Sequence, residues 1–149
     1  MKSLFSESAT EEILNRLDQL SPNAERAWGK MSVEQMLSHC QGPLEVSMGT
    51  KPLKKPNAFI ALLMKSFKKT MYNDIPWKKG VPTAKEFIVT SEKDFMVEKD
   101  KLTALITTFK KDEANAPWVV HPVFGAFTKE QWGQLNYKHL DHHLRQFGA

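Results

Sequence analysis

The sequence predicts an all-α bundle of four long helices followed by a fifth helix that carries histidines. Long stretches of the chain place apolar residues at intervals of three and four, the period of one helix face. Two stretches open on capping boxes, at residues 32–35 and 128–131. Convincing strand alternation is absent, although a short strand at residues 87–89 is an alternative. The 149 residues most simply form one domain, 1–149, because a chain of that length can bury a core.

The first helix is expected to run from Ser8 or Thr10 to Leu20. Either hydroxyl residue can serve as its N-cap, and the acidic residues that follow suit the positive end of the helix dipole. One apolar stripe is predicted to face the core; it consists of Ile13, Leu14, Leu17 and Leu20.

The second helix is expected to begin after Ser32 and to contain Pro43. Proline has no N–H, so the carbonyl of His39 loses the donor that would lie four residues later. This predicts a kink or a free carbonyl at that histidine. The alternative is that Pro43 ends a short helix near Cys40.

A third helix is expected over residues 57–72, and a fourth from the segment 91–94 to about Lys111. The third helix should turn one apolar face inward and its lysines mostly outward; the inward residues are Phe59, Ile60, Leu63 and Phe67. The connections 73–86 and 114–127 are long, and connections of that length often shape a site.

The last helix follows the capping box at Thr128 and holds three of the chain's five histidines. His139 and His143 are four residues apart, which places them one above the other on the same face as Trp132. The charged and polar residues on the opposite face should meet water; they are Gln134, Lys138, Asp141 and Arg145. Two imidazoles at this spacing can share one metal ion. The alternative is a pair of core histidines that form hydrogen bonds.

The positions of the histidines resemble those of the DinB-like (YfiT/DinB) family of metalloenzymes. One histidine lies on the second helix, in the segment 36–40, and a His-x-x-His-His-x-x-Gln run occupies residues 139–146. The segments 28–32 and 121–125 resemble a subgroup of that family with an HPxFG…HxxHHxxQF signature. The resemblance implies a four-helix bundle with extra short helices and long loops, often a homodimer. It also implies a divalent metal held by His39, His139 and His143.

Three histidines leave a coordination position open, which is typical of a catalytic metal site. Zinc, nickel, iron and manganese all tolerate such ligands. The sequence therefore favours a metal-dependent enzyme with a small-molecule substrate. It would be either a hydrolase that uses metal-activated water or, by analogy with relatives, a transferase for a low-molecular-weight thiol. The alternative is a non-catalytic metal or small-ligand binding module with a role in stress.

Further residues are candidates for supporting roles. His121 lies in an apolar loop before the last helix and could act as an acid, a base or a substrate contact; alternatively it fixes the turn before Pro122. Gln146 lies one turn beyond His143 and could hydrogen-bond to it, and His142 could meet a neighbouring helix or a carboxylate. Cys40 lies within the apolar stripe of the second helix, where an inert buried thiol is usual.

Composition narrows the remaining partners. No apolar run approaches the roughly 20 residues of a membrane span, and the first residues lack the apolar core of a secretory signal. The single cysteine fits a reducing cytoplasm. The formal charge of +4 comes with several lysine clusters, which most simply form solvated surface. Neither nucleic acid nor a membrane is therefore expected as a partner.

Overall fold

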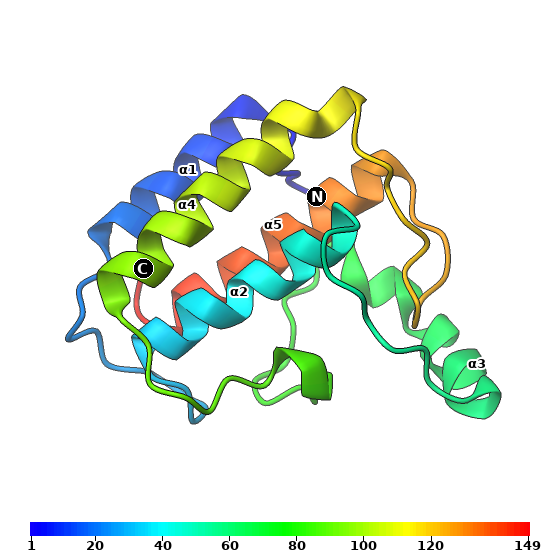
Figure 1. The fold of residues 1–149 in the computed structure, drawn as a ribbon, viewed down its shortest axis with the longest axis horizontal. Helices are drawn as coiled ribbons and strands as arrows, with labels where there is room; N and C mark the ends of the chain where they lie inside the picture. The colour runs from blue at the N-terminus through cyan, green and yellow to red at the C-terminus, as the bar shows by residue number, and fades with distance from the viewer.

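The computed structural model describes residues 1–149 and is all-helical. Four long helices pack as a bundle; they are α1 (Glu7–Gln19), α2 (Val33–Ser47), α4 (Phe95–Lys111) and α5 (Lys129–Gln146). In Figure 1, α1 and α4 lie side by side above α2 and α5. Both α1 and α2 pack against α4 and α5, so the four apolar stripes meet in one core. The all-α prediction is confirmed, and α2 and α5 become neighbours.

The caps of α2 and α5 are those predicted. Ser32 accepts a hydrogen bond from the backbone N–H of Gln35, whose side chain accepts one from the N–H of Ser32. Thr128 opens α5 with the same reciprocal pair. The predicted cap of α1 was wrong, because the helix begins at Glu7 after Ser6. Thr10 lies inside α1, and its hydroxyl donates to the carbonyl of Leu4 at 2.6 Å.

The second helix continues through Pro43 as far as Ser47, so the alternative of an early end near Cys40 is wrong. Gly42 lies beside the proline, and the ring of Phe87 packs directly against it. A Cβ atom at Gly42 would lie 2.6 Å from Cδ1 of Phe87. Phe87 belongs to the short 3₁₀ helix η2 (Lys85–Phe87), so the alternative strand at 87–89 is also wrong.

The third helix departs most from expectation. Instead of one helix over 57–72, the chain forms α3 (Ala58–Ser66) followed by the 3₁₀ helix η1 (Lys68–Met71). None of the residues of α3 is buried, and Figure 1 shows the helix projecting away from the bundle. The expected inward residues are exposed; they are Phe59, Ile60, Leu63 and Phe67. The buried core contains no residue of α3 and is formed mainly by α1, α2, α4 and α5.

The fourth helix begins after Asp94, whose carboxylate accepts a hydrogen bond from the N–H of Val97, and it ends at Lys111 as predicted. A third 3₁₀ helix, η3 (Asp112–Ala114), follows it. The loop from there to α5 is held against the core by Trp118, whose ring contacts Phe109 at a centroid distance of 5.4 Å. None of the helices combines the length and the apolar character that crossing a membrane requires.

Candidate metal centre

Three buried histidines meet between α2 and α5. His39 comes from α2, and His139 and His143 come from successive turns of α5. One ligand atom from each lies within 4.8 Å of the others, and the ring centroids are 4.7–5.0 Å apart. The Nε2 atoms of His39 and His139 are 3.1 Å apart. The three side chains therefore lie close enough to hold one metal ion.

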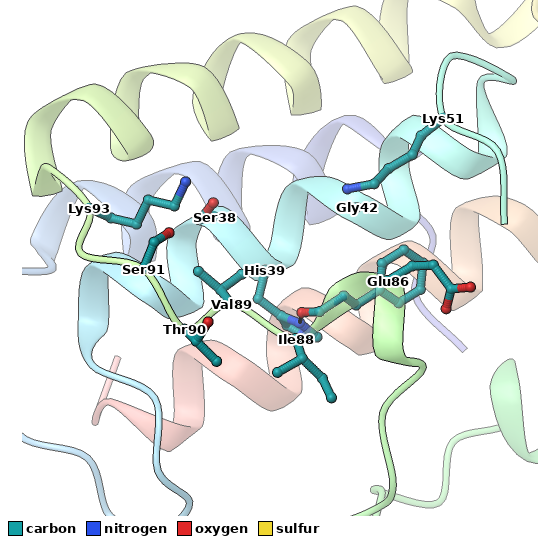
Figure 2. Close-up of a pocket in the computed structure, with 11 residues that line it drawn as sticks. Ser38, His39, Gly42, Lys51, Glu86, Ile88, Val89, Thr90, Ser91 and Lys93 are labelled. Carbon is teal, nitrogen blue, oxygen red and sulfur yellow. Dashed lines mark hydrogen bonds between the residues drawn. The ribbon is translucent and has the colours of Figure 1, made fainter.

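A backbone carbonyl orients His39. Its Nδ1 atom lies 2.8 Å from the carbonyl oxygen of Phe87. A carbonyl can only accept, so Nδ1 carries the proton and donates. The Nε2 atom is then left with a lone pair that faces His139. Figure 2 shows His39 extending from α2 toward the segment that carries Ile88 and Val89, directly after Phe87.

A glutamine orients His143 in the same sense. The Nδ1 atom of His143 lies 2.8 Å from Oε1 of Gln146, and Nε2 of Gln146 donates to the carbonyl of Trp28 at 2.6 Å. The second contact requires the amide nitrogen of Gln146 to face Trp28, so its oxygen faces the histidine. His143 therefore donates from Nδ1 and keeps a lone pair on Nε2. The hydrogen bond considered for Gln146 is present.

Gly29 allows this contact with Trp28 to form. Its φ angle is +82°, a left-handed conformation that other residues rarely adopt, and a Cβ atom there would lie 2.5 Å from Nε2 of Gln146. The backbone N–H of Ala27 also donates to the carbonyl of Gln146, at 2.8 Å. The segment before α2 is thus fixed to the end of α5 at the residue that orients His143.

Burial keeps the three histidines neutral. It lowers the pKa of His143 to about 3 and lowers the pKa values of His139 and His39 as well. The neighbouring imidazoles add to this effect at His139, because each proton taken up there would repel the next. Neutral imidazole is the form that binds a metal. His39 and His143 each have a lone pair on Nε2. Neutral His139 has a single N–H group and can donate to only one of them, so one lone pair is left without a hydrogen-bond donor. The three ligand atoms together therefore fit a cation.

The segment of residues 70–77, which carries Trp77, lies over the α5 side of the centre. The ring of Trp77 is 5.9 Å from that of His139 and 5.8 Å from that of His142. His142 also contacts Trp28, with centroids 5.6 Å apart. It therefore meets two tryptophans rather than a carboxylate, and its supporting role stays a prediction.

Lys138 holds the 70–77 segment in place. The sequence did not predict this role. The residue was expected to face water, but it is buried, and its ammonium donates to the carbonyls of Thr70 and Asn73 at 2.8 and 2.9 Å. Burial lowers the pKa of Lys138. Asp141, also expected to be solvated, forms an ion pair with Arg16 at 2.8 Å. Both expectations were wrong because α1 and the 70–77 connection cover that face of α5.

Two cavities border the centre. One, of about 260 Å³, lies between α2 and residues 86–93 and is lined by His39 together with polar residues such as Lys51 (Figure 2). The other, of about 270 Å³, lies on the α5 side and is lined by Trp77, His142 and Lys138 among others. Each cavity reaches a residue of the centre or its immediate neighbour.

His121 lies away from the three histidines. Its ring packs against Trp132 at a centroid distance of 5.6 Å, and Trp132 precedes His139 by about 10 Å along the helix axis. Its Nδ1 accepts hydrogen bonds from the backbone N–H groups of Val123 and Phe124, at 3.1 and 3.3 Å. These contacts are those of a histidine that fixes a turn. Its acid or base role stays a prediction that no contact with the cluster supports.

Cys40 is buried beside Met36, and burial raises the pKa of its thiol. A protonated thiol without access to solvent is a poor nucleophile. This environment is the one expected of an inert core cysteine.

Sequence reasoning missed the groups that orient the ligands. The carbonyl of Phe87 has no signature of its own, although the adjacent Gly42 and Pro43 within a helix signal a close approach at that point. Gly29, next to Trp28, is a comparable signal for a left-handed turn. Lys138 gave no signal, because a lysine opposite an apolar stripe usually faces water.

Comparisons with known proteins place the chain in a family without assigning a reaction. No curated protein and no solved structure matches it significantly. The family model described as "Protein of unknown function (DUF1569)" matches residues 2–149, a range that includes His39, His139, His143 and the residues that orient them. Because the match extends over nearly all of the chain, the protein belongs to the DUF1569 family.

Proposed function

We propose that this protein is a metal-dependent enzyme whose centre is one divalent transition metal held by His39, His139 and His143. It acts on a small molecule, either as a hydrolase or as a transferase that joins a low-molecular-weight thiol to an electrophile. The observation that carries the proposal is the enforced orientation of two ligands: the Phe87 carbonyl and the Gln146 side chain each accept a hydrogen bond from an Nδ1–H group, which leaves the lone pair of each ring on Nε2.

The number of protein ligands favours an enzyme. The cluster contains three histidines, and the remaining buried histidine, His121, packs against Trp132 and does not join them as a fourth ligand. A three-histidine metal supplies a Lewis acid with an open position, which can activate water or a substrate atom. Asp141 is bound to Arg16, so it is unsuited to act as a base. The metal remains one of zinc, nickel, iron or manganese.

The family relationship and the oligomeric state of the protein are part of the same proposal. We infer that the chain is DinB-like, because one histidine of α2 meets two of the last helix in a four-helix bundle, as that resemblance implies. The homodimer expected from the resemblance is part of the same proposal. Light scattering of the purified protein tests it, with twice the mass of the 17.1 kDa chain as the expected result.

The experiment that tests the activity uses protein loaded with one equivalent of each of the four metals in turn. Two screens are run: hydrolysis of an activated ester, and substitution of the halide of a chromogenic aryl halide by the cysteine thiol, with release of halide and a proton. We expect one metal to support turnover in one screen, and we expect His139→Ala with the same metal to lose it. Turnover that persists in His139→Ala would contradict the assignment of the centre.

A non-catalytic binding module is the second candidate, and the burial of the site favours it. Each of the three histidines is at most 9% exposed, which limits access for a bulky substrate. Cobalt-loaded protein separates the two candidates without an activity assay. Cysteine that reaches an open position adds a sulfur-to-cobalt absorption band, and the enzyme proposal predicts this band. A spectrum unchanged by thiol, together with silent screens, would support the binding module.

The hydrogen bond from His143 to Gln146 makes a prediction of its own. Gln146→Leu is expected to weaken metal binding by about 10–100-fold, because the ring of His143 loses the acceptor that fixes its orientation. Competition with a chromogenic chelator measures the dissociation constant. Gln134→Leu is the matched control, since Gln134 lies on the same helix, is only partly buried, and its side chain donates a hydrogen bond to Glu130 rather than to a histidine. Equal affinities in both variants would contradict the orienting role.

A further inference from the structure

The exposed helix α3 differs from the rest of the surface in the number of large apolar side chains that it exposes. Phe59 and Leu62 are 79% and 70% exposed, and three more large apolar side chains between residues 60 and 67 are about half exposed. Soluble surfaces rarely gather so many large apolar groups in one place, and such patches mark interaction sites. The closest helical neighbour of α3 is η1, and Figure 1 shows α3 at the edge of the molecule. Nothing in the bundle covers this apolar surface.

Lysines flank α3 on both sides in the sequence. Residues 46–73 include six lysines and no acidic residue, although the whole chain has a formal charge of only +4. Two of the six are engaged, since Lys51 pairs with Glu45 and Lys68 donates to the carbonyl of Ala126. The other four form no ion pair and are exposed; they are Lys54, Lys55, Lys65 and Lys69. The apolar surface of α3 therefore has free positive charge at both ends.

We propose that α3 is a docking element for an anionic lipid surface, with Phe59 and Leu62 inserted among the acyl chains and the flanking lysines at the headgroups. A short apolar helix bordered by lysines has the composition of an interfacial membrane anchor. Lysines near a membrane surface are attracted by anionic lipid, and the attraction falls off within about 10 Å at ordinary salt. The inference is independent of the metal centre.

Charge distinguishes a membrane from the other occupants. A second copy of this chain docked through α3 would bring the same free lysines together without an acidic partner in the segment, which is unfavourable. Nucleic acid would meet the lysines but would leave the apolar side chains in water. An anionic bilayer satisfies both groups. The expectation of no membrane partner rested on the lack of a spanning segment, and a helix that lies in the interface needs none.

The test is sedimentation of the full chain with vesicles of phosphatidylcholine alone and of phosphatidylcholine mixed with phosphatidylglycerol. We expect binding to the mixed vesicles at least tenfold tighter than to the neutral ones. Phe59→Ser/Leu62→Ser should weaken that binding at least tenfold. The control Met96→Ser/Val97→Ser changes two exposed apolar residues on α4 and should leave it unaltered.

A second pair of variants isolates the charge. Lys55→Gln/Lys65→Gln should weaken binding to the mixed vesicles about tenfold or more, and Lys30→Gln/Lys111→Gln, with the same loss of charge elsewhere, should weaken it much less. Circular dichroism checks that all variants fold. The proposal is overturned if wild-type protein fails to sediment with anionic vesicles, or if binding is equal in the α3 and control variants. A dimer that only Phe59→Ser/Leu62→Ser dissociates, without vesicle binding, would instead assign α3 to self-association.

Discussion

A saturating transition metal is expected to raise the melting temperature of the metal-free protein by about 5–10 °C. A ligand at 100 times its dissociation constant stabilises the folded state by about 2.7 kcal/mol, and a domain of this size gains about 2–4 °C per kcal/mol. The stabilisation requires the folded arrangement of His39, His139 and His143, because these residues come from two helices. Differential scanning calorimetry with and without metal measures it.

The variants make this measurement specific. His139→Ala should abolish the shift, since two remaining imidazoles hold a metal weakly. His142→Ala lies on the same helix, but its ring contacts Trp28 and Trp77, so most of the shift should remain. An equal shift in wild type and His139→Ala would mean that the metal binds elsewhere.

Mild acid is expected to destabilise the metal-free protein strongly. Four buried histidines have pKa values below their usual range; they are His39, His121, His139 and His143. The unfolded chain takes up protons at these residues below about pH 6.5, whereas in the folded chain His121 and His143 stay neutral down to about pH 4 and 3. The contribution of these neutral histidines to the free energy of unfolding is therefore fully present above about pH 6.5 and is lost as the pH falls toward their pKa values in the folded chain.

His121 and His143 each remove about 1.4 kcal/mol of folding stability per pH unit in this window, and His39 and His139 act in the same direction. Several of them acting together can exhaust the roughly 5–15 kcal/mol of a typical domain within a few pH units. Denaturant unfolding at pH 7.5, 6.5 and 5.5 measures the slope. His121→Gln should reduce the slope by about one histidine's contribution while leaving metal binding intact. A free energy of unfolding that is constant between pH 7.5 and 5.5 would refute the neutral, buried state of these residues.

Local signals in the sequence predicted the frame of the site. The capping boxes at Ser32 and Thr128 fixed the starts of α2 and α5, and the four-residue spacing of His139 and His143 placed them on the inner face. Both signals depend on neighbours within one helix turn. Capping motifs and helix periodicity were therefore sufficient to predict them.

Long-range contacts were beyond such signals. His39 is 100 residues from His139, and only the family resemblance joined them; periodicity alone gives a helix face but no partner. The carbonyl of Phe87 could not be foreseen, because every residue has one. The exposure of α3 was not expected from its apolar pattern. Such a pattern predicts that one face of a helix packs against another apolar surface, but it does not identify that surface.

Elemental analysis of untagged protein tests the proposed centre most directly, with a His139→Ala/His143→Ala variant prepared in parallel. The expected result is about one equivalent of a transition metal per chain in the wild type and none in the variant. No bound metal in the wild type, even after incubation with zinc, nickel, iron or manganese at neutral pH, would contradict the centre. The three histidines would then be a polar core in which His139 donates to His39.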